Sequence, residues 1–135
     1  MIEVFAEHLG EVQFEVRARG HKLLCDQPAS GGGFDEGMTP PELMLASLAS
    51  CAGYYAAEYL KSRGIVATGT VVRVTAEKAK APARLDDFQI EVDVPLDLSD
   101  SDQQGMERAV HKCLVHNTLL SPPSIHISSK ILHPA

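Results

Sequence analysis

An uncharged stretch in the middle of the chain constrains the fold more than any other feature. No charged residue occurs in residues 43–57, yet this run is shorter than the ~20 apolar residues that cross a bilayer. A helix start precedes it, because Thr39 can cap, Pro40 takes the favoured first position and Glu42 completes a capping box. We predict a helix from there to residues 61–63, apolar on nearly every side and therefore buried centrally.

Alternating patterns on both sides of this helix predict strands. Apolar and polar side chains alternate over residues 12–16, and residues 21–25 form a second short strand after a turn. Beyond the helix, residues 70–77 and 88–96 alternate again. We predict a hairpin there with a longer loop that contains Pro82.

A second helix and a last strand complete the expected order. Residues 99–102 begin the helix, with Ser101 and Gln104 as a possible capping box. Its core-facing stripe consists of Met106, Ala109, Val110, Cys113 and Leu114. Three isoleucines over residues 125–131 predict a final strand. This order predicts an α+β fold rather than a parallel α/β sheet.

Composition limits the function classes. The chain has 135 residues, and we expect a single domain over residues 1–135. Its net charge of −6 argues against a nucleic-acid or anionic-membrane partner. The acidic amino terminus does not resemble a signal peptide. Three cysteines, an odd number, indicate a reducing compartment, so a cytoplasmic location is expected.

Two cysteines carry the chemical interpretation. Cys51 lies within the first predicted helix and Cys113 near the carboxyl end of the second. The apolar faces of both helices must be buried, most simply against each other, which would bring the sulfurs together. The negative end of a helix raises a thiol pKa, so Cys51 is expected to attack and Cys113 to resolve. Both could equally be small buried hydrophobic residues.

Other candidates have simpler interpretations. Cys25 on a strand is expected to be a core residue. His111 and His116 are five residues apart, so on one helix they would not share a face, and we predict no metal site. Arg17 and Arg19 are most simply solvent-facing strand charges.

The two cysteine segments resemble those of a known superfamily. The run TPPELMLASLASC, residues 39–51, is similar to the helix start and reactive cysteine of the OsmC/Ohr superfamily. The run CLVHNTL, residues 113–119, resembles the second cysteine motif of that family. Residues 20–28, GHKLLCDQP, resemble the preceding strand and loop. The likeness covers almost the whole chain.

The resemblance implies a fold and an activity. The implied fold is antiparallel sheets around two central helices in an intertwined homodimer, with active sites at the subunit interface. The implied activity is reduction of organic hydroperoxides by a cysteine-based peroxidase, an antioxidant role in oxidative stress. Cys51 would be peroxidatic and Cys113 resolving, through an intramolecular disulfide that a dithiol reductant restores without any cofactor.

Two positions depart from the peroxidase pattern. Pro41 stands where those members carry a glutamate that holds an arginine over the thiol, and Glu11 occupies the usual position of that arginine. Arg17 and Arg19 are nearby substitutes. The closer resemblance is to the broader OsmC-like branch, which lacks this Glu/Arg pair.

Supporting residues and alternatives remain open. Glu42 is either a capping residue or a hydrogen-bonding partner at the mouth of the site. Tyr54 and Tyr55 lie three and four positions after Cys51, where they pack beside the sulfur or line a substrate pocket. An alternative function is a non-catalytic dimer that binds a small apolar ligand in an interface cleft lined by Tyr54, Tyr55 and Met44. A purely structural or stress-associated interaction protein is a third possibility.

Overall fold

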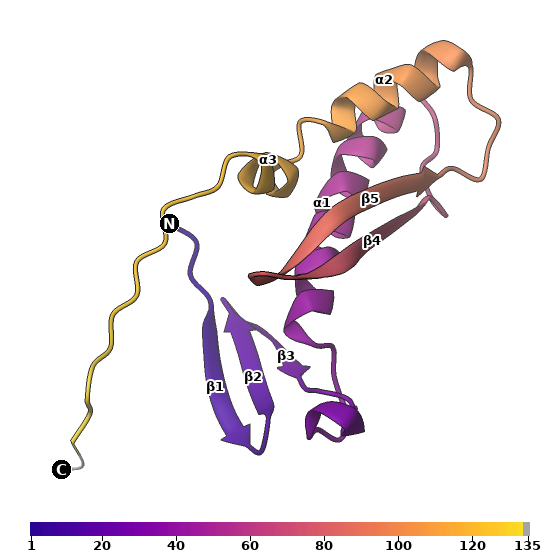
Figure 1. The fold of residues 1–135 in the computed structure, drawn as a ribbon. Coiled ribbons are helices and arrows are strands. Elements are labelled where there is room, and N and C mark those ends of the chain that lie inside the picture. The colour runs from indigo at the N-terminus through magenta and orange to yellow at the C-terminus, as the bar shows by residue number, and fades with distance from the viewer. Residues whose placement is uncertain (134–135) are drawn as a thin grey trace.

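The computed structural model describes residues 1–133 and contains antiparallel strands and helices, so the predicted α+β class is confirmed (Figure 1). The elements in chain order are β1 Phe5–Gly10, β2 Gln13–Ala18, β3 His21–Cys25, the short 3-10 helix η1 Ala29–Gly31, α1 Pro40–Ser62, β4 Val71–Lys80, β5 Ala83–Asp93, α2 Asp100–Val110 and α3 Leu114–Leu120. Two separate sheets result, one with the order β1-β2-β3 and one formed by β4 and β5. In Figure 1 these sheets lie at different levels along α1.

Helix α1 begins where the sequence predicts. The Thr39 hydroxyl accepts a hydrogen bond from the Glu42 backbone N–H at 3.4 Å and donates one to the Glu42 carboxylate at 2.8 Å. This satisfies one of the amide groups that every helix start leaves unpaired. The prediction that α1 is buried on nearly every side is wrong for the chain alone. Only the stripe of Leu48, Ala52, Ala56 and Leu60 is fully buried, and the other positions of α1 are partly or fully exposed.

The β1–β3 sheet contains one strand that the sequence analysis missed. Strand β1 pairs antiparallel with β2, and every residue of β1 is exposed. An element with neither face buried carries little apolar alternation, so periodicity does not predict it. The predicted turn between β2 and β3 is confirmed, since the Arg17–Lys22 and Ala18–His21 pairs lead directly into it.

A buried carboxylate organises the loop between β3 and α1. Asp26 is 0% exposed, and its oxygens accept hydrogen bonds from the backbone N–H groups of Gln27, Phe34 and Glu36 at 2.8–3.2 Å. The Gln13 side chain donates a fourth bond at 3.0 Å. These donors satisfy a charge that would otherwise be costly to bury. The loop that delivers the chain to α1 is therefore closed around Asp26.

Strands β4 and β5 form a hairpin that packs on α1 through β4. The pairing extends to Lys80↔Ala83, so only two residues connect the strands, and the predicted longer loop is wrong. Next to the connection, the strands carry mainly polar side chains, so no alternation of apolar residues predicts that these segments are strands. Next to the hairpin, a core forms from Ala56, Leu60 and Met106.

The second predicted helix is divided in two. Helix α2 is capped by Ser99, whose hydroxyl accepts from the Asp102 N–H at 3.1 Å, so the capping box expected at Ser101 is wrong. Helix α2 ends at Val110, and α3 begins at Leu114 with Cys113 as its N-cap. The apolar spacing continues through this break, which is why periodicity did not detect it.

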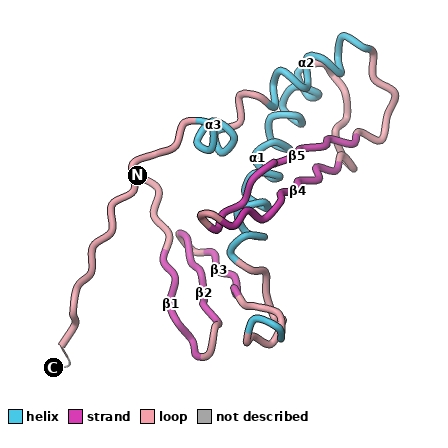
Figure 2. Tube along the Cα trace, viewed as in Figure 1, coloured by secondary structure: helices cyan, strands magenta, loops and turns pink. Residues whose placement is uncertain are grey.

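The last predicted strand is absent from the described residues. Residues 121–133 have no regular secondary structure and are exposed throughout (Figure 2). A strand needs a neighbour for its backbone hydrogen bonds, and within residues 1–133 no segment supplies one. The isoleucine pattern therefore predicted a strand that the isolated chain does not form. Among residues 1–133, no helix has the length and apolarity needed to cross a membrane.

Candidate functional site

The structure brings Cys51 and Cys113 into contact. Cys51 is half-buried in the middle of α1, beside the fully buried Ala52, and Cys113 is 0% exposed in the turn between α2 and α3. The two thiols are close enough to influence each other's ionisation: hydrogen bonding between them lowers the pKa of Cys51 and raises that of Cys113. The expectation that the two sulfurs lie close together is confirmed, but the expectation that Cys113 lies on the second helix is wrong. Both cysteines are free thiols.

Hydrogen bonds lower the pKa of the Cys51 thiol. Partial burial alone would raise the pKa of the Cys51 thiol, but hydrogen bonds from the Cys113 thiol and from the Val115 and Leu114 N–H groups outweigh it. The pKa of Cys51 therefore lies below that of an ordinary thiol. Hydrogen bonds to the charged form stabilise a thiolate as a nearby cation does. The sequence analysis did not identify these donors, because it continued the second helix through residues 111–113 and did not predict a separate α3.

Cys113 has the opposite electrostatics. Burial, followed by the hydrogen bond to Cys51, raises the pKa of the Cys113 thiol, while the N–H groups of His116 and Val115 oppose the increase. The predicted increase in the pKa of Cys113 is right. The reason given for it, the negative end of a helix, is wrong, because Cys113 precedes the positive end of α3 rather than ending α2. Desolvation of the thiolate is the larger effect. The pair thus combines one thiol that ionises readily with one that retains its proton.

The residues expected around Cys51 lie along α1. Tyr55 is four residues after Cys51, one helical turn away, and its ring meets that of Tyr54 edge-on at 5.3 Å. Tyr54 is 60% exposed and Met44 is 40% exposed. Glu42 lies nine residues before Cys51, about 13 Å along the helix axis, and pairs with Thr39.

The expected arginines lie elsewhere in the described chain. Arg17 pairs with Glu7 at 3.2 Å and Glu15 at 3.8 Å on the face of the β1–β3 sheet. Arg19 lies in the β2–β3 turn with a φ of 56° and is exposed. Glu11 lies in the β1–β2 turn, where its carbonyl is 2.8 Å from the His8 ring. These positions all belong to the β1–β3 sheet, which is a separate sheet from the one packed on α1.

Two histidines lie closer together than their spacing along the sequence predicts. The rings of His111 and His116 lie 5.5 Å apart, contrary to the expectation for one helix, because the helix breaks between them. Within residues 1–133, no three His, Cys, Asp or Glu side chains are grouped so as to hold a metal ion. Cys25 is 6% exposed at the end of β3, and burial raises the pKa of its thiol.

Comparisons with known proteins identify the family of the chain. Residues 33–128 match the family model described as OsmC-like protein. A search of curated proteins found no significant match.

Solved structures share the fold at low identity. A Psychrobacter arcticus protein named for osmotic stress induction and a detoxification response is 22% identical, with a TM-score of 0.80 over 87% of this chain and 88% of that one. An OsmC-like protein from Mycoplasma pneumoniae is 16% identical, with a TM-score of 0.76 over 90% and 89%. An organic hydroperoxide resistance protein from Elizabethkingia anophelis is 20% identical, with a TM-score of 0.67 over 90% and 89%. The chain belongs to the OsmC-like protein family.

Proposed function

We propose that this chain is a thiol-dependent reductase of organic hydroperoxides, with Cys51 as the attacking residue and Cys113 as the resolving residue. The observation that carries the proposal is the hydrogen bonding between the Cys51 and Cys113 thiols, together with the opposite pKa directions of the two thiols. The thiolate is the nucleophilic form of cysteine. Named relatives in the fold, such as hydroperoxide resistance proteins, support the same class of chemistry.

The expected reaction consumes one hydroperoxide and forms one disulfide. The Cys51 thiolate attacks the outer peroxide oxygen, the O–O bond breaks, and the leaving alkoxide takes up a proton to become an alcohol. Cys51 is then a sulfenic acid. The Cys113 sulfur attacks the Cys51 sulfur and water leaves, which closes the intramolecular disulfide. A dithiol reductant restores both thiols by exchange and is itself oxidised to a disulfide.

Disulfide mapping after a single exposure to peroxide tests the proposal. The reduced protein is treated with one equivalent of tert-butyl hydroperoxide, alkylated, digested and analysed by mass spectrometry. We expect a Cys51–Cys113 bond and one equivalent of tert-butanol. Cys113→Ser should stop at the sulfenic acid, which dimedone traps on Cys51, and Cys25→Ser is the matched control that should behave as wild type. Free Cys51 and Cys113 beside unconsumed peroxide would contradict the proposal.

The exposed surface supports a homodimer. The chain exposes 10419 Å², whereas a compact monomer of this size exposes about 6,900 Å². The excess is roughly 3,500 Å² per chain, or about 7,000 Å² for two chains, which is at the large end of the total surface that obligate dimers bury. We therefore propose that the working form is a homodimer in which the free faces of α1 and the sheets are covered.

Exposed apolar side chains favour a second candidate function. Tyr54 and Met44 lie on α1 near Cys51 and are 60% and 40% exposed. In a dimer they could line a cleft for a small apolar ligand. Retained ligand binding by Cys51→Ser, together with no peroxide turnover by wild type, would favour this non-catalytic function.

A further inference from the structure

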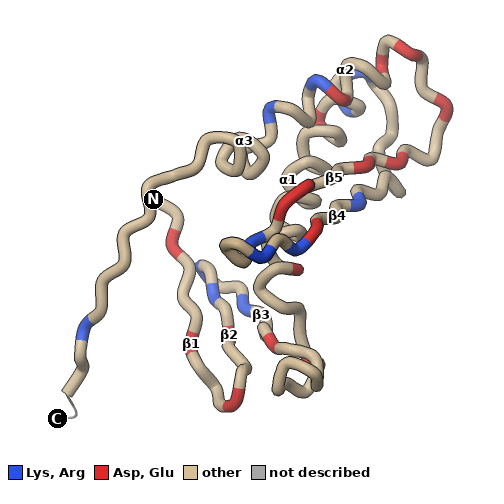
Figure 3. Tube along the Cα trace, viewed as in Figure 1, with Lys and Arg blue, Asp and Glu red and all other residues tan. Residues whose placement is uncertain are grey.

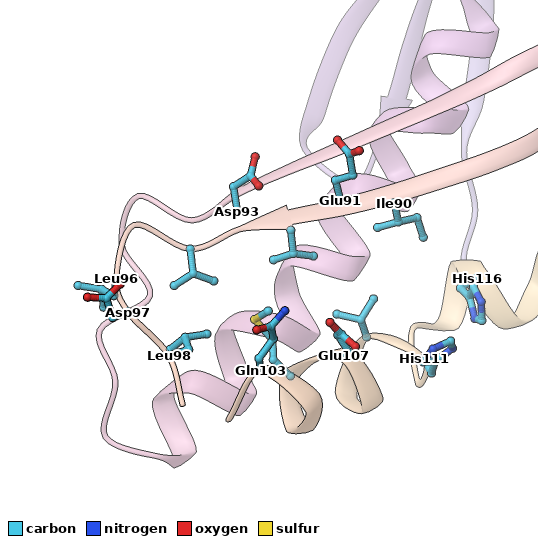
Figure 4. Close-up of a pocket in the computed structure, with 14 residues that line it drawn as sticks. Ile90, Glu91, Asp93, Leu96, Asp97, Leu98, Gln103, Glu107, His111 and His116 are labelled. Carbon is cyan, nitrogen blue, oxygen red and sulfur yellow. The ribbon is translucent and has the colours of Figure 1, made fainter. Parts of the chain in front are cut away.

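Two histidine side chains meet where helices α2 and α3 adjoin. His111 is the C-cap of α2, His116 lies in the first turn of α3, and their ring centres are 5.5 Å apart. Figure 4 shows the two rings next to each other at one end of a groove between β5 and α2. The sequence analysis predicted no metal site because it placed both histidines on one helix. The break at residues 111–113 removes that reason.

The spacing of the two rings is that of two imidazoles on one metal ion. A zinc ion lies about 2.0–2.1 Å from a ligating histidine nitrogen, and therefore about 3.2 Å from the centre of the ring. Two such rings at a tetrahedral angle have centres about 5.2 Å apart, which is close to the 5.5 Å observed. The ring planes differ by 76°, so the pair is not a face-to-face stack that would leave no room for an ion.

A neighbouring amide group can orient the His116 ring. Its Nδ1 atom lies 3.3 Å from the side-chain oxygen of Asn117. When Nδ1–H donates to that oxygen, the lone pair is on Nε2, which is then the atom available to a metal ion. Histidines that bind metals commonly donate their other N–H to an oxygen in this way, which fixes the tautomer and the orientation of the ring.

The charge around the histidine pair favours a cation. The carboxylates that line the groove are Glu91, Asp93, Asp97 and Glu107. Figure 3 shows this negative charge along β5 and the loop toward α2. Glu107 lies one helical turn before His111, whose N–H donates to the Glu107 carbonyl at 3.2 Å. The nearest basic residues along the chain, Arg108 and Lys112, do not line the groove.

We propose that His111 and His116 bind a zinc ion across the turn between α2 and α3. Imidazole suits zinc among the common divalent metals. Within residues 1–133 no third His, Cys, Asp or Glu side chain is grouped with the pair, so water completes the coordination and the ion exchanges with solution. Two protein ligands supply roughly half the binding free energy of a four-ligand structural site, which corresponds to a dissociation constant of about 1–200 μM.

A bound ion would join the end of α2 to the start of α3. Cys113 lies between the two histidines along the chain and is 0% exposed in this turn. Backbone hydrogen bonds of 3.0 Å hold the turn, from the Cys113 N–H to the Val110 carbonyl and from the Asn117 N–H to the Cys113 carbonyl. An ion that binds only the closed turn stabilises it against local opening. The inference concerns the histidines and does not rest on the proposed reductase activity.

Calorimetric titration of the full-length reduced protein with zinc tests the site. His111→Gln and His116→Gln should each weaken zinc binding by about a hundredfold or more, and Asn117→Ala should weaken it about tenfold. His21→Gln, at an exposed histidine of β3, is the matched control and should leave the dissociation constant unchanged. Undetectable binding to the wild-type protein at 1 mM zinc (about five times the weakest expected dissociation constant), or binding that survives both histidine substitutions, would overturn the proposal.

The two thiols are the alternative ligands, and two measurements separate them from the histidines. The double variant Cys51→Ser/Cys113→Ser should bind zinc as the wild type does. Wild-type protein titrated with Co²⁺ should show the weak visible bands of an ion bound by nitrogen and oxygen, without the intense thiolate-to-cobalt band in the near ultraviolet. That thiolate band, or loss of zinc binding in the cysteine variant alone, would assign the ion to the thiols and refute the inference.

Hydrogen exchange followed by mass spectrometry tests whether the ion joins the two helices. At a free zinc concentration ten times the dissociation constant, exchange of the amides in residues 113–117 should slow by about tenfold in the wild type. The same zinc concentration should leave exchange in His116→Gln unchanged. Equal exchange with and without zinc in a wild-type protein that binds the ion would show that the site does not span the turn. Because none of these readouts uses peroxide, failure of the reductase proposal would leave this inference standing.

Discussion

Two glycines inside helices should respond in opposite ways to replacement by alanine. Gly105 lies in α2, and a Cβ atom there would overlap the Tyr59 ring. It would lie 2.7 Å from Cε2 of Tyr59 and closer still to Cζ and the hydroxyl oxygen. Gly53 lies in α1, and a Cβ atom there would lie 3.4 Å from a Val72 methyl group, an ordinary contact. The close approach of α2 to α1 therefore depends on Gly105 and not on Gly53.

Two opposing free energies decide whether alanine stabilises or destabilises the protein at each position. Alanine is favoured over glycine in a helix interior by about 1 kcal/mol, and this gain applies at both positions. Overpacking a filled site costs about 1–3 kcal/mol, sometimes more. The overlap at Gly105 involves a ring whose hydroxyl is fixed by a 3.1 Å hydrogen bond to Asp102, so displacing Tyr59 also disturbs that bond. We expect Gly105→Ala to destabilise by about 2 kcal/mol and Gly53→Ala to stabilise by up to about 1 kcal/mol.

Urea unfolding followed by circular dichroism, at one fixed protein concentration, measures both changes. A double-mutant cycle identifies the cause. Tyr59→Leu replaces the ring with a shorter side chain, so it should remove most of the stability that Gly105→Ala costs. The α2–α3 turn that holds Cys113 follows from this packing, so Gly105→Ala should also slow closure of the Cys51–Cys113 disulfide. If Gly105→Ala gains stability as Gly53→Ala does, the inferred contact is wrong.

Two further predictions concern ionisation. Iodoacetamide alkylation followed by peptide mass spectrometry should show that Cys51 reacts at lower pH than Cys25. Cys113→Ala removes a hydrogen-bond donor to Cys51, so it should move the pH dependence of Cys51 alkylation to higher pH. An unchanged pH dependence would contradict this. The pKa of Asp26 is lowered, chiefly by the hydrogen bond from the Gln13 side chain together with those from the loop amides. The Asp26 carboxylate therefore binds a proton more readily in the unfolded protein than in the folded one. Its contribution to stability is complete above the unfolded pKa of about 3.9, and this contribution is lost as the pH falls from there through the lower pKa of the folded state. Asp26→Asn should reduce the urea midpoint at pH 7 far more than Asp35→Asn at an exposed position of the same loop, and the gap should narrow below about pH 4; equal losses would refute the assignment.

Local signals predicted the elements that depend on local physics. The start of α1 follows from Thr39, Pro40 and Glu42, since capping needs only the residues within one turn. Strand alternation identified β2, and the turn after it separated β2 from β3. The order of strands and helices was enough for the α+β class, because each pattern specifies which face must be buried.

Boundaries that depend on packing were missed. Apolar spacing carried the second helix straight through residues 111–113, because apolar residues continue at helical spacing after the break. The prediction that Leu114 faces the core is wrong, since it is 62% exposed at the start of α3. That break places the amide groups of Leu114 and Val115 on Cys51, and it brings the His111 and His116 rings together. Helical spacing alone predicted neither.

The sequence by itself determined the capped central helix, the alternating strands and the two cysteine segments, since each is encoded by residues close together along the chain. Only the tertiary structure decided what lowers the pKa of Cys51, because the hydrogen-bond donors lie at the start of another helix more than sixty residues later. It also decided that the last isoleucines form no strand within one chain. A strand exists only where another backbone completes its hydrogen bonds, and that condition is set by assembly in space rather than by the order of residues.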